Sequence, residues 1–239
     1  MSNHEREAAV GMALARRAYL YSLFHVVFGG EPTEETLERL FGAESLDGLS
    51  AALSDDADGA LDAFARKLSR VREDFDDDKA ATASSLRSDY TALFEIPGAA
   101  YAHPWESSYI GDGKMVFQES TLDVRSFYHE AGFKLQAEKR FPDDHIAAMM
   151  DYLGRTGQRA YDAFADGLDA DAARELARAR RFIESHVLTW VDAFAEAVAE
   201  HDARGFYASA AQAMASFSRA DAARAEELAR DIESLSAEE

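Results

Sequence analysis

Cysteine is absent from this chain of 239 residues. Without a thiol, the chain has no disulfide, no thiolate ligand for zinc or an iron–sulfur cluster, and no cysteine nucleophile. Proline and glycine are scarce, with 4 and 14 residues, so few positions force the backbone out of a helix. Hydrophobic residues make up 47% of the chain, enough for a sizeable core, which excludes a disordered protein.

Positive charge is also in short supply. Lys and Arg number 25 against 45 Asp and Glu, which gives a formal net charge of −20. Such a surface repels the phosphate backbone, so we expect no nucleic-acid partner. The charge suits a cationic peptide or protein segment as partner, but the simpler interpretation, which we favour, is solubility, for example in a saline cytoplasm. The composition leaves both interpretations open.

Long apolar runs are missing as well, so we expect no membrane span. Arg16-Arg17 precede the apolar stretch 18–28 and superficially resemble a twin-arginine export leader. The stretch is short, His25 interrupts it, and no small-residue cleavage site follows. We therefore interpret it as part of the first helix and expect a cytoplasmic protein.

Apolar residues recur at spacings of three and four along most of the chain, as at Leu61, Phe64 and Leu68. This spacing is typical of helices that bury one face. We predict an all-α fold, with about ten helices in one bundle-like domain over residues 1–239 and an irregular aromatic loop near the middle. A break is expected at Gly154 and Gly157. The expected helices cover residues 5–28, 34–41, 45–53, 58–75, 80–94, 120–131, 142–153, 161–164, 169–201, 206–217 and 222–235.

The helical pattern is lost between residues 95 and 119, where Tyr101, Trp105, Tyr109 and Phe117 are found. Long irregular loops in compact domains are usually functional. Trp and Tyr combine a large apolar surface with a polar group, which suits a peptide or protein interface. The alternative is that these rings fill the core beneath the loop.

Sequence signatures of nucleotide binding, serine hydrolysis and zinc proteolysis are missing. The seven histidines are scattered singly, so we expect no catalytic residue, no metal site and no cofactor. Only Asp143-Asp144-His145 places acids beside an imidazole. This segment has three interpretations: a helix start with dipole-complementing acids, an acid–base or metal site, or a binding site.

An aromatic stripe recurs every four residues near the end of the chain. Its members share nearly one face of a helix, which is typical of a buried core. They are Phe182, His186, Trp190 and Phe194.

Several short motifs follow one another along the chain, and the last of them is this stripe. The others are Arg87-x-Asp89-Tyr90-x-x-Leu93-Phe94, Pro104-Trp105-x-Ser107-x-Tyr109, Tyr128-x-x-x-Gly132-Phe133 and Pro142-Asp143-Asp144-His145-Ile146. In this succession the chain resembles the TorD/DmsD/NarJ family of cytoplasmic redox-enzyme maturation chaperones over most of its length. It is more similar to the TorD and DmsD branches than to NarJ.

The resemblance implies an all-helical chaperone that catalyses no reaction. Its partner would be the twin-arginine leader of a molybdopterin oxidoreductase of the dimethyl sulfoxide or trimethylamine N-oxide reductase type, held for cofactor insertion before export. Binding of the enzyme's mature part stays open, as does the choice between a monomer and a helix-exchanged dimer. The implied peptide-binding residues are Tyr90, Leu93, Phe94, Pro104, Trp105, Ser107, Tyr109, Pro142, Asp144 and His145.

Such a leader presents two guanidiniums followed by an apolar stretch, so its receptor needs carboxylates and an apolar groove. Asp143, Asp144 and Glu106 are the expected carboxylates. Met149-Met150 stand where the family often has a glutamate-leucine pair. The expected apolar groove consists of Leu93, Phe94, Trp105 and Tyr109.

The alternative function is a generic acidic helical adaptor without affinity for leaders.

Overall fold

The computed structural model describes residues 2–53, 56, 58–110, 119–134 and 142–236. The all-α prediction is confirmed: this part of the chain forms ten α-helices and, apart from one isolated β-bridge, no strand. None of the described helices is long and apolar enough to cross a membrane. The helices are α1 (Asn3–Phe28), α2 (Glu34–Leu40), α3 (Ala43–Ala52), α4 (Ala60–Asp77), α5 (Lys79–Tyr90), α6 (Glu119–Glu130), α7 (Ile146–Ala165), α8 (Asp169–Phe182), α9 (Val191–His201) and α10 (Phe206–Ser236).

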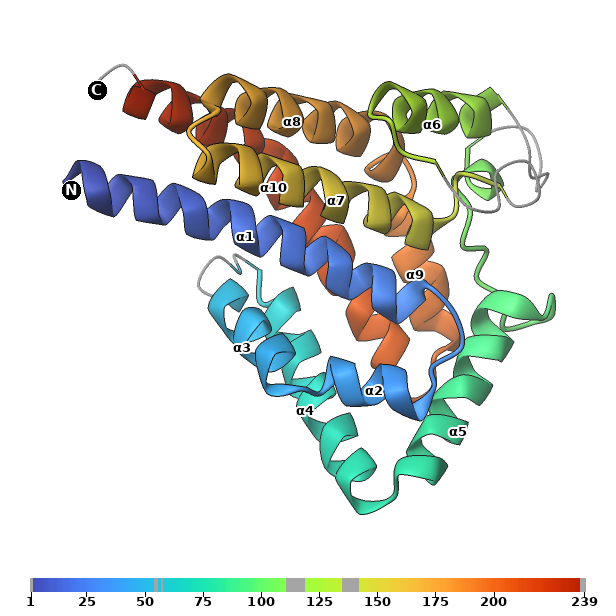
Figure 1. Ribbon diagram of the computed structural model, residues 1–239. Helices are drawn as coiled ribbons and strands as arrows, with labels where there is room; N and C mark the ends of the chain where they lie inside the picture. The colour runs from blue at the N-terminus through green and yellow to red at the C-terminus, as the bar shows by residue number, and fades with distance from the viewer. Residues whose placement is uncertain (1, 54–55, 57, 111–118, 135–141, 237–239) are drawn as a thin grey trace.

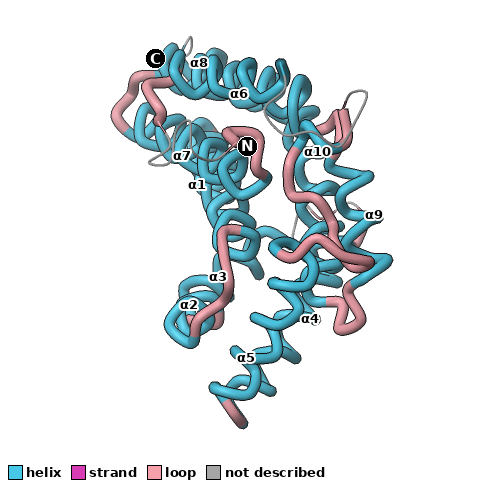
Figure 2. Tube along the Cα trace, turned by 90° about the vertical axis from the view of Figure 1, so that its right-hand side faces the viewer, coloured by secondary structure: helices cyan, strands magenta, loops and turns pink. Residues whose placement is uncertain are grey.

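Helix α1 runs through the middle of the molecule, and α7 lies along it in the opposite direction (Figure 1). Helix α10 also contacts α1 and connects the two ends of the fold, since it packs against α8, α9 and α4. In Figure 1 and Figure 2, α2 to α5 form the lower part of the molecule and α6 to α8 the upper part. Buried residues from α1 through α10 belong to one large hydrophobic cluster, which joins these parts.

The break predicted at Gly154 and Gly157 is wrong, because α7 continues through both residues. Their role lies in packing. A Cβ at Gly157 would lie 3.1 Å from the backbone of Ala18, and one at Gly154 would lie 2.8 Å from Ser22 Oγ. The two glycines therefore allow α7 to approach α1 closely, and this contact offsets their low helix propensity.

The single helix predicted for residues 169–201 is also wrong. After α8 the chain forms a π-helical turn over Ile183–Val187 and then leaves helical geometry, before α9 begins at Val191. Trp190 has φ −146° and ψ −16°, and its buried ring stacks on Tyr109. Tertiary packing thus interrupts a segment that has no glycine or proline to indicate a break.

Conversely, the two helices predicted at the end of the chain are one continuous helix, α10. Ser218 and Asp221 lie where the apolar pattern fails, but both are buried. Asp221 faces inward because it binds Arg17 of α1. In the sequence, the buried polar residue Asp221 interrupts the apolar pattern and is therefore mistaken for the end of a helix.

Candidate functional site

The two motifs singled out in the sequence, around Trp105 and around His145, lie side by side. The backbone N–H of Glu106 donates to the carbonyl of Asp144 at 3.1 Å, and that of Ile146 donates to the carbonyl of Pro104 at 2.9 Å. The backbone N–H of Ser107 donates to Asp144 Oδ2 at 2.8 Å. Sequence spacing gave no sign of this pairing between loops far apart in the chain.

Tyr90, Leu93 and Phe94 lie in the core beneath the first loop. All three are buried, and the Tyr90 hydroxyl donates to the carbonyl of Phe28 at 3.0 Å. The backbone N–H of Ala102 donates to the carbonyl of Leu93 at 2.8 Å, which fixes the start of the loop. These residues support the loop and offer no exposed surface, so the expectation that Leu93 and Phe94 line an open groove is not met. A role in peptide binding remains a prediction for them.

The carboxylates of Asp143 and Asp144 point into the protein. Asp143 accepts a hydrogen bond from Arg125 Nε at 2.8 Å, and Asp144 is fully buried beside Ser107. Pro142, which precedes them, is buried too. An incoming guanidinium cannot reach these oxygens from solvent, so the geometry does not provide the acidic receptor that we expected from them.

Glu106, the third expected carboxylate, is likewise buried. Its two carboxylate oxygens lie 3.1 and 3.2 Å from Nδ1 of His186, and the Thr189 hydroxyl donates to one of them at 3.4 Å. Burial raises the pKa of Glu106, and the hydrogen bond from His186 opposes this shift. Glu106 thereby connects the loop to the segment between α8 and α9.

What the site does expose is a row of half-buried rings, Tyr101, His103, Trp105 and His145, called here the aromatic strip. The ring centroid of Tyr101 lies 4.5 Å from that of His103 and 6.5 Å from that of Trp105, and the centroids of Trp105 and His145 are 5.5 Å apart. Trp105 and His145 also form the isolated β-bridge between the two loops. The strip combines partly exposed ring surface with polar ring atoms, a combination that is enriched at peptide and protein interfaces.

His145 has a second, structural role at the start of α7. Its Nδ1 accepts a hydrogen bond from the backbone N–H of Ala147 at 3.1 Å, so the ring caps the helix. Burial and the nearby His25 lower the pKa of His145 to about 4. The ring is therefore neutral at pH 7. The helix that the sequence placed from residue 142 begins at Ile146.

The aromatic stripe is confirmed as core, since Phe182, His186, Trp190 and Phe194 are all buried. Tyr109 stacks on Trp190 with 5.3 Å between ring centroids and 30° between planes. This contact fixes the far end of the loop. The remainder of the predicted loop, including Phe117, lies outside the described residues.

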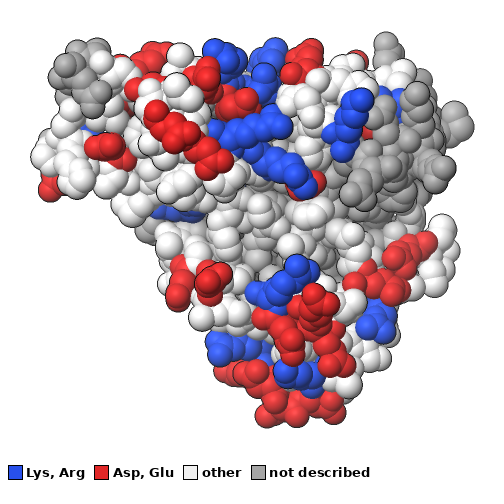
Figure 3. Space-filling view, viewed as in Figure 1, with Lys and Arg blue, Asp and Glu red and all other residues white. Residues whose placement is uncertain are grey.

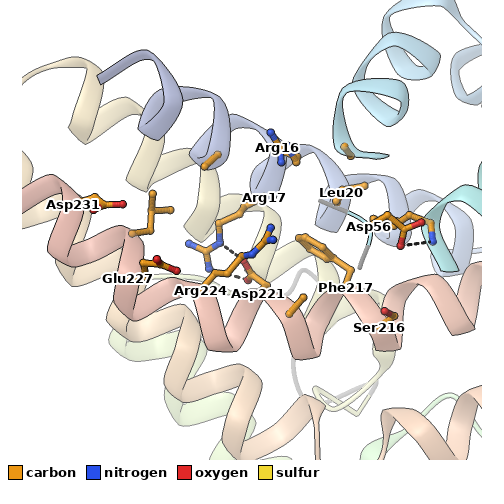
Figure 4. Close-up of a pocket in the computed structure, with 15 residues that line it drawn as sticks. Arg16, Arg17, Leu20, Asp56, Ser216, Phe217, Asp221, Arg224, Glu227 and Asp231 are labelled. Atoms are coloured by element: carbon orange, nitrogen blue, oxygen red, sulfur yellow. Dashed lines mark hydrogen bonds and ion pairs between the residues drawn. The ribbon is translucent and has the colours of Figure 1, made fainter. Parts of the chain in front are cut away.

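A cavity of about 350 Å³ opens between α1 and α10, and the sequence did not predict it (Figure 4). Arg17, which the close-up shows pointing toward α10, donates through Nη2 to Asp221 Oδ2 at 2.9 Å. Tyr21 donates to the same oxygen at 2.8 Å. Arg17 thus holds α1 against α10, which agrees with the interpretation of Arg16-Arg17 as part of a helix.

Among the described residues, no group of three or more His, Asp or Glu side chains is placed to hold a metal ion. The site as described consists of partly exposed aromatic rings over inward-facing acids.

Comparison with known proteins identifies the class to which this fold and site belong. Residues 50–196 match the family model described as nitrate reductase delta subunit. Because the match covers more than half of the chain, the chain belongs to this family. The resemblance to the TorD and NarJ chaperones is thereby confirmed.

The chain is also similar to individual proteins that are named as chaperones. The chain is 26% identical to "Chaperone protein TorD" of Vibrio parahaemolyticus over 211 residues, 87% of this chain and 94% of the relative. It is 26% identical to the protein of the same name from Photobacterium profundum over 212 residues, 87% of this chain and 93% of that one. It is 27% identical to the protein of the same name from Vibrio cholerae O395 over 208 residues, 86% of this chain and 90% of that one. These relatives are named as chaperones, so the prediction of a protein that is not an enzyme is confirmed, and the family supports a role in redox-enzyme maturation.

Proposed function

We propose that this protein is a cytoplasmic chaperone that binds the twin-arginine leader of a molybdopterin oxidoreductase of the dimethyl sulfoxide or trimethylamine N-oxide reductase type. It holds the leader so that the cofactor is inserted before export. The observation that carries the proposal is the pairing of the two motif loops, which brings Trp105 against His145 at the surface. In a family of maturation chaperones, such a surface favours peptide binding.

The aromatic strip has the chemistry that the apolar part of a leader needs. Half-buried rings are held in place by the core below them, so little side-chain entropy is lost when a peptide covers them. Leader residues in an amphipathic helix can bury their apolar face on such a surface. We treat the chain as one chaperone domain, since the large hydrophobic cluster includes residues from α1 through α10.

Calorimetry with synthetic peptides tests the proposal. A peptide with two arginines followed by an apolar segment should bind at roughly micromolar strength, about −8 kcal/mol. Replacing both arginines by lysine should weaken binding, because lysine cannot form the bidentate fork that a carboxylate accepts from arginine. Equal affinity for the two peptides would contradict recognition of the guanidiniums. Absence of binding to either peptide would contradict the proposed function and favour the generic adaptor.

A further inference from the structure

Asp143, Asp144 and Glu106 are buried, so they do not bind the two guanidiniums of a leader. Another part of the surface has to provide the carboxylates. An exposed groove of about 640 Å³ lies beside the end of α5, where the chain forms a π-helical turn over Thr91–Glu95. Its apolar wall includes Ala92, Ile96, Ala99 and Ala100. Ile96 is 60% exposed, among the most exposed large hydrophobic residues of the described chain. Apolar surface of this kind, on the same segment that leads into the aromatic strip, indicates a docking surface.

Two carboxylates, Glu31 and Glu95, lie next to residues that line this groove and are called here its rim. Glu31 follows the end of α1 and accepts a hydrogen bond from the Thr91 hydroxyl, which lines the groove, at 2.7 Å. Glu95 closes the π-helical turn, is exposed, and lies close enough to Glu31 for the two carboxylates to interact electrostatically. Partial burial and the charge of Glu31 raise the pKa of Glu95. Two like charges this close repel each other, and a cation between them relieves the repulsion.

The rim is negative even after its basic neighbour is included. Arg87 also lines the groove, and its Nε lies 3.9 Å from Glu31 Oε2, too far for a hydrogen bond. Arg87 and Glu31 thus form an ion pair, and Glu95 adds a second carboxylate beside Glu31, so carboxylates outnumber guanidiniums here. The carbonyl groups at the C-terminal end of α1, just before Glu31, add partial negative charge. Figure 3 shows acidic side chains over α2 and the end of α5 on this face, with a few basic ones among them.

We propose that this groove is the docking surface for the leader, with Glu31 and Glu95 binding its arginine guanidiniums and Ile96 contacting the apolar segment that follows. The inference rests on the proposed function and names the residues that perform it. Tyr101 follows Ala100 directly and begins the aromatic strip, with its ring centroid 4.5 Å from that of His103. A peptide leaving the groove therefore continues over the strip toward Trp105 and His145.

The test of the rim uses two double variants with the same change in net charge. Glu31→Gln/Glu95→Gln removes both rim carboxylates. Glu7→Gln/Glu233→Gln removes two exposed carboxylates from α1 and α10 near the two chain ends, far from the groove (Figure 1). The titrants are a peptide with the arginine pair and an apolar segment, and the same peptide with both arginines replaced by alanine. Thermal melting verifies that each variant is folded.

The rim variant should bind the arginine peptide about tenfold or more weakly than the unmodified protein, since charge-assisted contacts are lost. It should bind the alanine peptide with unchanged affinity. The control variant should bind the arginine peptide within about twofold of the unmodified protein, because its charges are distant and screened. If both double variants lose the same affinity, the effect is one of net charge and the assignment of the rim is overturned.

The apolar wall is tested with Ile96→Ser, and Leu168→Ser, at an exposed leucine between α7 and α8, serves as its control. Ile96→Ser should weaken the binding of both peptides several-fold, whereas Leu168→Ser should leave the affinity for both unchanged. If the unmodified protein binds the arginine peptide and neither the rim variant nor Ile96→Ser alters binding, the groove is overturned while the proposed function stands. If the unmodified protein binds no peptide, the proposed function fails and the inference fails with it.

Discussion

At the scale of single residues, burial decides what each aromatic or acidic side chain does. Trp105 and Trp190 are the only two tryptophans of the chain. Trp190 is 2% exposed and stacks on Tyr109, whereas Trp105 is half-buried in the aromatic strip. The same side chain therefore supports the core in one place and lies at the surface, within the proposed binding site, in the other.

This contrast predicts opposite results for two alanine variants. Trp190→Ala should lower the free energy of unfolding by about 3–5 kcal/mol, because it removes a fully packed ring from the core. Trp105→Ala should change stability much less, and it should weaken binding of the arginine peptide about tenfold or more, as expected of an aromatic anchor. Denaturant unfolding and peptide calorimetry on both variants provide the measurement. A Trp190→Ala protein with unchanged stability would show that the core interpretation of the stripe is wrong.

At the scale of helices, the sequence predicts elements that one buried face defines and fails where tertiary contacts override the local pattern. The first helix, predicted at 5–28, is observed as Asn3–Phe28, and its predicted end at Gly29 is the C-cap. The wrong boundaries have physical causes in partners far away in sequence. Gly154 and Gly157 serve the contact with α1, and Asp221 binds Arg17. A local sequence pattern holds no information about these distant contact residues.

The close contact of α7 with α1 leads to a prediction about glycine. In an open helix position, replacing glycine by alanine stabilises the helix by about 0.5–1 kcal/mol. At Gly157 the new Cβ would lie 3.1 Å from the Ala18 backbone, which cannot move aside without shifting α1. Gly157→Ala should therefore destabilise the protein by about 1–3 kcal/mol.

Gly11 in α1 is the matched control, because its Cβ would meet only Phe164 Cε1 at an ordinary 3.8 Å. Gly11→Ala should leave the melting temperature equal or raise it, whereas Gly157→Ala should lower it. Equal shifts for the two variants would show that helix propensity governs both positions and that close packing of α7 does not.

At the scale of the whole molecule, a net charge of −20 suits a cationic partner and suits solubility, and it does not indicate where a partner binds. The sequence predicts which loops matter, because Trp105 and His145 stand in the motifs that resemble the family. It cannot predict that Asp143, Asp144 and Glu106 turn inward, since their orientation depends on Arg125, Ser107 and His186. For the same reason it missed Glu31 and Glu95, which are separated in sequence and meet only because α5 ends beside α1.

Salt dependence separates the two interpretations of the acidic surface. If carboxylates attract the leader, the affinity for the arginine peptide should fall steeply from low to high sodium chloride, because the screening length drops from about 10 Å at 0.1 M to about 3 Å at 1 M. The alanine peptide should show little change, since its contact is apolar. The Glu31→Gln/Glu95→Gln variant should have a shallower salt dependence than Glu7→Gln/Glu233→Gln, although both carry the same net charge. If the charge serves solubility alone, titrations of the arginine peptide at both salt concentrations will give the same dissociation constant.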